Sequence, residues 1–388
     1  MKKIGLCVSF QGTNYGMLLQ CFATQEILGK LGYETEIIKY KSGFFKGVKP
    51  SFAAFHVGIS VIKRKFHSSK TKKRLVDDLH QKNIDERILV SRKFRDERLK
   101  NVVTVTGIHQ LREKSKEYHA VLAGSDQLWL PDATVGNFYT LRFAADGVLR
   151  ISYATSLGVS EYPSYARKPA KDFLKKMDYI SVRESEGKNI INGICDVSVE
   201  VVCDPTYLFT SEEWKNFIPY KNLHKEKYVL SYMLGNDENQ KRFIRKFADM
   251  NNLKVVSILS NESNSDDSSY ADEILTGQTV EEFINLIRNS EFVMTDSFHG
   301  MAFTIMNHKQ FYAFYRVRDD SKFSRNSRID NILRLWGIQD RLVSEPQNME
   351  YTDKRVDYYA VEEKIDRLRE KSLEFLKSAL RGEKYDYE

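Results

Sequence analysis

The sequence predicts an α/β protein with two Rossmann-like, doubly wound domains that face each other across a cleft. Short apolar runs such as 118–123 and 292–294 are too short for helices, and they alternate with stretches whose apolar residues recur at helical spacing. Both halves of the chain show this alternation, and 388 residues suit two domains better than one. No run of eighteen apolar residues occurs, so no membrane-spanning helix is expected.

Residues 1–219 are predicted to form the first domain. A strand at 3–9, a helix at about 15–31 and a strand at 34–40 give it a βαβ start. The turn at 11–16 lacks the spaced glycines of a dinucleotide-binding fingerprint, so a cofactor-binding Rossmann domain is rejected. Later strands of this domain are expected at 118–123, 150–154, 179–182 and 197–202.

A polar linker at 220–227 is expected to lead into a second Rossmann-like domain at 228–345. Its strands are predicted at 228–234, 254–259, 292–294 and 310–315. Residues 346–388 are expected to form a tail whose amphipathic helix packs back on the body.

The net charge of +7 is concentrated in one predicted insertion, at about 44–100, which has sixteen Lys or Arg against six Asp or Glu. Cations interleaved with aromatic residues at 44–74 are typical of a segment that binds an anionic membrane surface. A solvated insertion is the alternative. No nucleic-acid recognition motif accompanies the charge, so no nucleic-acid partner is expected. The cysteines lack metal-ligand spacing, which predicts free thiols in a reducing cytoplasm and no metal site.

The stretch 291–301 carries the main functional prediction. A short strand ends there, Asp296 and Ser297 are helix-capping residues, and 301–306 continues with helical spacing. Turns at the carboxyl ends of strands bind ligands in open α/β sheets, and a helix N-terminus favours phosphate or carboxylate. His299, with Ser297 and Gly300 in the same turn, is therefore predicted to lie beside a bound anion. The alternative is that His299 only caps or packs the turn.

Polar residues follow other predicted strands in the same way. Ser125, Asp126 and Gln127 follow the strand at 118–123 and are able to bind hydroxyls, and Trp129 offers a face for a sugar. A capped turn with a buried tryptophan is the alternative. Guanidinium groups suit carboxylate and phosphate, and the arginines that follow predicted strands are Arg183, Arg316, Arg318, Arg325 and Arg328. Their alternative role is in surface ion pairs.

Taken in order, these motifs resemble those of the polysaccharide pyruvyl transferase family, over about residues 4–341. The motifs are Asn14-Tyr15-Gly16, Gly124-Ser125-Asp126-Gln127-Leu128-Trp129, Ser152-Tyr153-Ala154, Ser181-Val182-Arg183-Glu184, Asp204-Pro205-Thr206 and Thr295-Asp296-Ser297-Phe298-His299-Gly300. The resemblance implies a glycosyltransferase type B (GT-B) like fold and phosphoenolpyruvate as donor. It further implies a pyruvate ketal placed on a sugar of a capsular or exopolysaccharide, or of its lipid-linked precursor. The family's histidine and strand-end arginine match His299 and Arg183.

Under this hypothesis the second domain is the donor side and the first is the acceptor side. His299 is either the catalytic acid or a phosphate ligand, and Asp126 is a possible base. The expected donor ligands are Arg183, Ser297, His299, Gly300, Arg316 and Arg318. The expected acceptor ligands are Asn14, Tyr15, Ser125, Asp126, Gln127 and Trp129.

The expected protein is cytoplasmic, peripheral on the inner face of the membrane, and needs no cofactor beyond phosphoenolpyruvate as co-substrate. Two alternatives stay open: a GT-B glycosyltransferase that uses a nucleotide sugar, and a non-catalytic sugar-binding protein.

Overall fold

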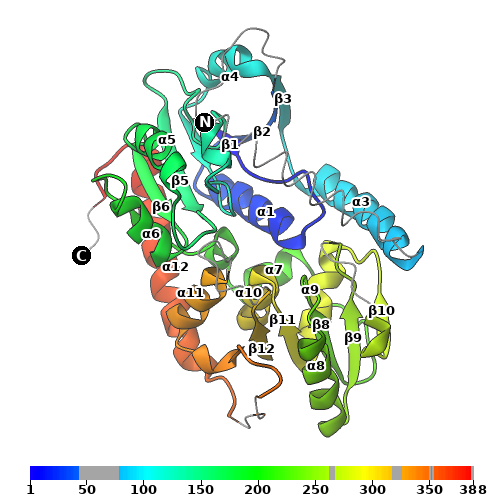
Figure 1. Ribbon diagram of the computed structural model, residues 1–388. Helices are drawn as coiled ribbons and strands as arrows, with labels where there is room; N and C mark the ends of the chain where they lie inside the picture. The colour runs from blue at the N-terminus through cyan, green and yellow to red at the C-terminus, as the bar shows by residue number, and fades with distance from the viewer. Residues whose placement is uncertain (43–77, 262–266, 317–325, 349–350, 352–353, 386–388) are drawn as a thin grey trace.

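A computed structural model describes residues 1–42, 78–261, 267–316, 326–348, 351 and 354–385. Two parallel sheets with helices packed on them form two Rossmann-like domains, one above the other in Figure 1. This confirms the predicted α/β, GT-B-like fold class. The basic stretch 44–74, proposed to meet a membrane, lies outside the described residues.

The first domain has a seven-stranded sheet in the order β3-β2-β1-β4-β5-β6-β7, with every pairing parallel. The strand order reverses direction between β1 and β4, and ligands of open α/β sheets usually bind at the carboxyl ends of strands at such a point. Its elements are β1 (Lys3–Cys7), α1 (Tyr15–Lys30), β2 (Glu34–Lys41), α3 (Asp78–Arg98), β3 (Val102–Thr106), α4 (Gly107–Ser115), β4 (Ala120–Ala123), β5 (Leu149–Thr155), α5 (Ser164–Leu174), β6 (Tyr179–Val182), α6 (Ser185–Asn192) and β7 (Glu200–Val201).

The second domain has a six-stranded parallel sheet in the order β10-β9-β8-β11-β12-β13. The 3-10 turn η2 (Pro205–Leu208) and the helix α7 (Ser211–Phe217) lead into it. Its elements are β8 (Tyr228–Tyr232), α8 (Glu238–Met250), β9 (Lys254–Ile258), β10 (Glu273–Leu275), α9 (Val280–Asn289), β11 (Phe292–Thr295), α10 (Phe298–Met306), β12 (Gln310–Phe314), α11 (Ser327–Trp336) and β13 (Leu342–Val343).

The last helix, α12 (Tyr358–Arg381), runs past α11 and back onto the first domain (Figure 1). There the Cys203 backbone N–H donates to Ser372 Oγ at 2.9 Å, and Tyr33 donates its hydroxyl to the Leu380 carbonyl at 3.3 Å. The apolar face of α12, which includes Phe375 and Leu376, is buried in the core that both domains share. This helix therefore ties the second domain to the first by burial of apolar surface.

Helix α3 lies across the junction of the two domains. Its Asn83 donates to the Leu259 carbonyl of the second domain at 3.1 Å, and its Arg87 donates to the Thr13 carbonyl of the first at 2.6 Å. These bonds hold the turn before α1 in a fixed position, and that turn borders the site described below. In the described part of the chain, no helix has both the length and the apolar character needed to cross a membrane.

Candidate functional site

His299 lies in the first turn of α10, directly after β11. Ser297 caps this helix, because its Oγ accepts from the Gly300 backbone N–H at 3.2 Å. The imidazole is 7% exposed and touches the first domain at Gly16, where a Cβ would lie 1.9 Å from Nδ1. The N-terminal turns of α1 and α10 therefore meet at His299. Helix N-termini carry partial positive charge, so their meeting point favours an anion.

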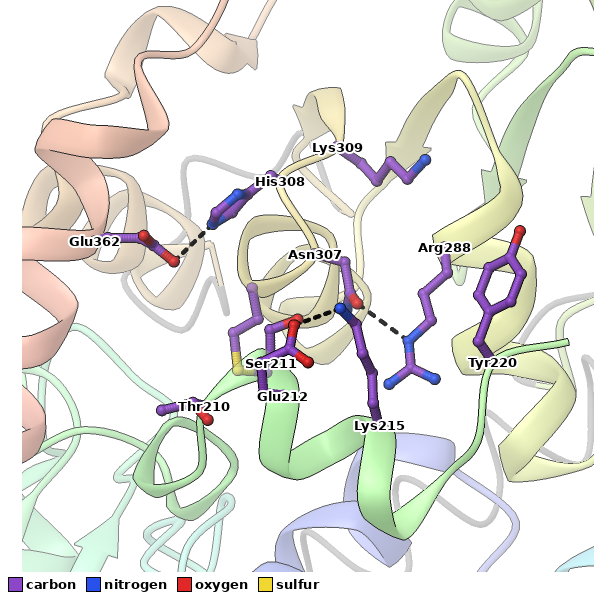
Figure 2. Close-up of a pocket in the computed structure, with 11 residues that line it drawn as sticks. Thr210, Ser211, Glu212, Lys215, Tyr220, Arg288, Asn307, His308, Lys309 and Glu362 are labelled. Atoms are coloured by element: carbon purple, nitrogen blue, oxygen red, sulfur yellow. Dashed lines mark hydrogen bonds and ion pairs between the residues drawn. The ribbon is translucent and has the colours of Figure 1, made fainter.

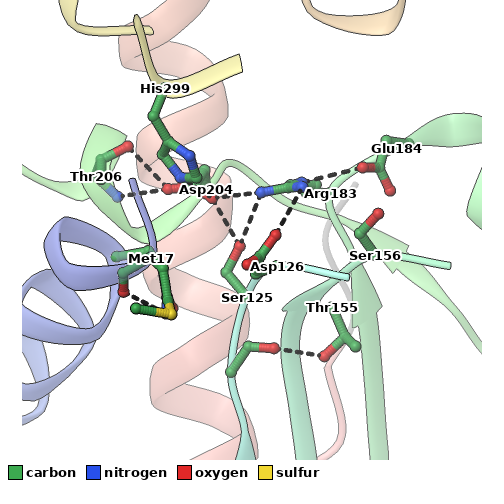
Figure 3. Close-up of polar contacts among 12 residues, drawn as sticks. Met17, Ser125, Asp126, Thr155, Ser156, Arg183, Glu184, Asp204, Thr206 and His299 are labelled. Carbon is green, nitrogen blue, oxygen red and sulfur yellow. Dashed lines mark hydrogen bonds and ion pairs between the residues drawn. The ribbon is translucent and has the colours of Figure 1, made fainter. Parts of the chain in front are cut away.

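Asp204 is the carboxylate that faces His299. Its Oδ2 lies 3.5 Å from His299 Nε2, and it is buried in the turn that follows β7 (Figure 3). The Thr206 backbone N–H and hydroxyl donate to Oδ1 at 3.0 and 2.8 Å, and the Ser125 hydroxyl donates to Oδ2 at 2.6 Å. These donors fix the position of Asp204, so the orientation of the imidazole is fixed with it.

Arg183, which directly follows β6, lies on the other side of Asp204. Its Nη1 donates to Asp204 Oδ2 at 3.0 Å, and its Nε donates to Glu184 Oε1 at 3.0 Å. Its Nη2 lies 3.8 Å from Asp126 Oδ1, beyond hydrogen-bond distance. The guanidinium also stacks over the Phe298 ring, with its carbon 4.2 Å from the ring centroid. One carboxylate therefore joins the predicted arginine to the predicted histidine.

The electrostatics of this cluster follow from burial and pairing. Burial alone would raise the pKa of Asp204, but the charges of His299 and Arg183 hold that pKa well below its usual range. Burial would likewise lower the pKa of Arg183, and the carboxylates of Glu184, Asp204 and Asp126 instead raise it. Arg183 and Asp204 are therefore ionised at neutral pH, and the charge of Arg183 is largely balanced inside the protein.

Two further arginines, Arg316 and Arg328, add positive charge near Arg183. The pKa of Arg328, at the start of α11, is lowered to about 10 by burial and by the nearby charges of Arg183 and Arg316. Arg316 follows β12, and its Nε lies 4.0 Å from Asp296 Oδ2. Three guanidinium groups thus lie close together at the junction of the two domains. A small anion placed among them would relieve their mutual repulsion.

Asp126 has strained backbone geometry beside this cluster. Its φ is 79°, in the left-handed region, and its carbonyl accepts from the Leu128 and Ser156 backbone N–H groups at 2.8 and 2.9 Å. Strain of this kind is concentrated at functional sites. With this backbone conformation the Asp126 carboxylate points toward Arg183, as Figure 3 shows.

The structure brings predicted donor ligands and predicted acceptor ligands into one cluster. His299, Arg183 and Ser125 all contact Asp204, Asp126 lies beside Arg183, and Arg316 lies near Arg328. Arg318 and Arg325 lie outside the described residues. Ser297 and Gly300 shape the turn: a Cβ at Gly300 would lie 2.8 Å from Thr295 Oγ1. Asn14 caps α1, with its Oδ1 accepting from the Met17 backbone N–H at 3.2 Å.

Two predicted acceptor ligands, Trp129 and Tyr15, are buried and cannot contact a sugar. Trp129 is 1% exposed and donates its Nε1 proton to the Tyr139 carbonyl at 2.9 Å, so no face of its ring is open to a sugar. Tyr15 is also 1% exposed; its ring stacks on Phe283, and its hydroxyl donates to the Gln278 carbonyl at 2.7 Å. It joins the two domains, and the predicted sugar contact is not available to it.

Gln127 is half-buried and packs against Gly158, where a Cβ would lie 2.6 Å from Gln127 Nε2. Its side-chain amide therefore contacts the loop that follows β5. This contact also accounts for a glycine at position 158, whose φ is +63°.

Three residues of the cluster are not among the predicted ligands: Gly16, Asp204 and Arg328. Asp204 could have been predicted, because it follows a strand and lies in the motif Asp204-Pro205-Thr206. Arg328 was one of several arginines in a polar loop and gave no separate signal. The role of Gly16 depends on contact with a helix of the other domain, and spacing along the chain does not show such a contact.

The fold and site thus define a two-domain α/β protein with an imidazole and several guanidinium groups at its domain junction, an arrangement whose charge suits a small anion. The family model for polysaccharide pyruvyl transferases matches residues 14–316. The chain therefore belongs to the polysaccharide pyruvyl transferase family. No match to a curated protein was found.

Several solved structures are similar in outline. The S. aureus MnaA–UDP complex is 14% identical, covers 100% of both chains and gives a TM-score of 0.48. A UDP-GlcNAc 2-epimerase from Neisseria meningitidis is 12% identical, with 95% and 99% coverage and a TM-score of 0.45. An E. coli heptosyltransferase with ADP is 11% identical, with 95% and 100% coverage and a TM-score of 0.39. At these identities and scores they carry no argument about the substrate of this chain.

Proposed function

We propose that this protein transfers a pyruvyl group from phosphoenolpyruvate to two hydroxyls of a sugar, in a capsular or exopolysaccharide or its lipid-linked precursor. Family membership supports the transferase class. The observation that carries the proposal is Asp204, which contacts both His299 and Arg183 at a junction that also holds Arg316 and Arg328. Phosphoenolpyruvate offers a phosphate and a carboxylate on a three-carbon unit, and such a donor matches closely spaced guanidinium groups.

In the proposed reaction His299 gives a proton to the methylene carbon of phosphoenolpyruvate. The double bond becomes a methyl group, and a cation develops at the neighbouring carbon, C2. One sugar hydroxyl oxygen bonds to C2 and releases its proton, for which Asp126 is the proposed base. The second hydroxyl then bonds to C2 while the bond from C2 to the phosphate oxygen breaks. Phosphate leaves with the electron pair and takes up the second hydroxyl proton.

The roles of the arginines follow from how their charges are balanced. Arg183 is occupied by Glu184 and Asp204, so it mainly positions the Asp204 carboxylate against His299. Arg328 and Arg316 are the proposed ligands of the donor phosphate and carboxylate, because an anion between them would relieve the repulsion that helps to lower the pKa of Arg328. The positive ends of α1 and α10 add to this attraction.

The test is mass spectrometry of the products formed from phosphoenolpyruvate and candidate lipid-linked sugars. We expect a pyruvylated sugar from the wild type and none from His299→Ala with unchanged folding. In deuterated water the product methyl group should gain one deuterium, because its third hydrogen comes from solvent through the acid. If His299→Ala instead kept the wild-type kcat and had a raised KM for phosphoenolpyruvate, His299 would be a phosphate ligand and not the acid.

Ligand protection separates this function from the alternatives. Phosphoenolpyruvate should raise the melting temperature of the wild type, and a panel of nucleotide sugars should not. Stabilisation by nucleotide sugars alone would favour a glycosyltransferase. Sugar binding with no transfer by the wild type would favour a non-catalytic sugar-binding protein.

We also propose that the protein works at the cytoplasmic face of the membrane, where lipid-linked acceptors lie. The support is the excess of cations among aromatic residues at 44–74. Wild type should bind vesicles that contain anionic lipid, and a variant without this segment should not. Equal binding by both proteins would remove this segment as the membrane contact.

A further inference from the structure

A cavity lies at the opposite end of α10 from His299. It has a volume of about 460 Å³ and is bordered by α7, the C-terminal ends of α9 and α10, and the first turns of α12 (Figure 2). Such a volume is within the range of small-molecule sites. His299 and Met306, which lines the cavity, are seven residues apart in α10, or about 10 Å along the helix axis. The proposed pyruvyl transfer makes no use of it.

The cavity is built around a buried arginine. Arg288 is 7% exposed; its Nε donates to Asn307 Oδ1 at 3.1 Å, and its Nη1 donates to the Ile218 carbonyl at 2.6 Å. Its Nη2 has no hydrogen-bond partner among the described residues. A buried guanidinium with an unused donor that lines a cavity is the arrangement expected where an external acceptor binds.

The charge of Arg288 is also poorly balanced inside the protein. Burial lowers its pKa to about 10, and Glu212 opposes that shift only in part. Lys309, another lining residue, has a pKa that burial lowers, and its ammonium donates to the Ser290 carbonyl at 2.9 Å. Both cations therefore lack the full pairing that buried charges need, and a bound anion would supply it.

The remaining lining residues suit hydroxyl groups. Figure 2 shows Arg288 bonded to Asn307 and Lys215 paired with Glu212, whose Oε1 lies 2.5 Å from the Lys215 ammonium. His308 and Glu362 complete this part of the wall. Glu362 Oε1 lies 2.8 Å from His308 Nε2, and Thr210 and Ser211 add hydroxyls to the wall. Tyr220, which is 58% exposed, adds a ring at the rim. The cavity thus has a cationic part and a part able to accept and donate hydrogen bonds.

We propose that this cavity is a binding site for a small phosphorylated sugar, with its phosphate on Arg288 Nη2 and the Lys215 ammonium and its hydroxyls near Asn307 and Glu362. Phosphate takes several charge-assisted hydrogen bonds at once, which matches a buried guanidinium donor without a hydrogen-bond partner beside a lysine that a single carboxylate, Glu212, neutralises. The hydroxyl-rich wall matches the sugar. This site is separate from the His299 cluster, and its occupancy does not depend on the proposed pyruvyl transfer.

The test is calorimetric titration of the full chain with glucose 6-phosphate, inorganic phosphate and glucose. We expect saturable binding of glucose 6-phosphate, weaker binding of inorganic phosphate, and none of glucose at the same concentrations. Arg288→Gln should weaken glucose 6-phosphate binding at least about tenfold, because one charge-assisted contact is lost. His299→Ala should leave this binding unchanged, which separates it from binding at the His299 cluster.

Lys215→Gln provides a second test in case Arg288→Gln does not fold. The Lys215 side chain is 45% exposed, so its substitution should not disturb folding. It should weaken binding severalfold. Its matched control is Lys377→Gln, which removes another lysine paired with a glutamate three residues before it, on a surface of α12 away from the cavity. No saturable binding to the wild type would overturn the proposal. The proposal would also be overturned if His299→Ala abolished the binding of glucose 6-phosphate and Lys215→Gln left it unchanged. Equal affinity for inorganic phosphate and glucose 6-phosphate would overturn the sugar part.

Discussion

The two ends of α10 place buried arginines in opposite electrostatic surroundings. At the N-terminal end, Arg183 lies among Glu184, Asp204 and Asp126, which raise its pKa. At the C-terminal end, Arg288 is surrounded mainly by carbonyl and amide oxygens, and burial lowers its pKa to about 10. Both side chains have lost most of their hydration, so the difference lies in the carboxylates around them.

The comparison separates a positioning arginine from ligand-binding arginines. A guanidinium that is balanced by carboxylates of the protein holds those carboxylates in place and has little charge left for a ligand. A guanidinium whose burial is not balanced gains most when an anion arrives. By this criterion Arg288 resembles Arg328, whose pKa is also lowered to about 10, and differs from Arg183. The predictions below test this distinction, beginning with the largest expected effect.

Asp204→Asn should abolish measurable pyruvyl transfer and lower the free energy of unfolding by about 3–5 kcal/mol, because it leaves Arg183 buried without its central partner. Urea unfolding measures the stability. The control is Glu374→Gln, which removes one partner of an ion pair with Lys377 in which both side chains are accessible to solvent, and it should cost about 1 kcal/mol or less. A stable, active Asp204→Asn variant would show that Arg183 and His299 do not depend on this carboxylate.

The effect of Asp204→Asn on the free energy of unfolding should also depend on pH. The pKa of Asp204 is lower in the folded protein than its usual 3.8. A lowered carboxyl pKa gives stability that is fully present above the unfolded value and is lost as the pH falls toward the folded one. The stability difference between wild type and Asp204→Asn should therefore be constant above about pH 5 and shrink below about pH 4. A difference that grows on acidification would contradict the assigned ionisation of Asp204.

Gly16→Ala should lower kcat about 100-fold, because its Cβ would lie 1.9 Å from His299 Nδ1 and the imidazole must move. Steady-state kinetics measure the effect. The matched control is Gly29→Ala in the same helix, where a Cβ meets nothing within 4 Å. That variant should keep full activity and gain up to about 1 kcal/mol of stability. Normal activity of Gly16→Ala would mean that the position of His299 is not critical.

Arg328→Gln should raise KM for phosphoenolpyruvate about tenfold or more, with stability unchanged to within about 1 kcal/mol. The stability is preserved because the change removes repulsion from Arg183 and Arg316. Kinetics with varied phosphoenolpyruvate, alongside urea unfolding, give both quantities. Arg334→Gln on the exposed side of the same helix should change neither. A large stability loss without a KM effect would place Arg328 in the same structural class as Arg183.

Trp129→Phe should have the smallest effect. It removes the hydrogen bond from Nε1 to the Tyr139 carbonyl and should cost about 1 kcal/mol of stability. KM for the sugar acceptor should stay unchanged, because the ring is buried. Thermal unfolding and acceptor-dependent kinetics check the two statements. A raised KM for the acceptor at unchanged stability would restore the sugar-stacking prediction for this residue.

Patterns along the chain were enough to predict the fold class and the strand-end turns that carry His299 and Arg183. Short apolar runs followed by capping residues place β11, α10 and His299, because strand burial and helix capping are local properties read along the chain. Arg183 was found in the same way, directly after β6.

Which of these residues meet, and which carboxylates balance their charges, depends on how distant segments pack together. Gly16 touches His299, and Asp204 joins His299 to Arg183, through contacts between segments far apart in the sequence. Trp129 and Tyr15 look suited to a sugar until their burial is known. The charges of Arg183 and Arg288 look alike in the sequence. What separates them is how many carboxylates surround each one after both have left water, and packing alone sets that number.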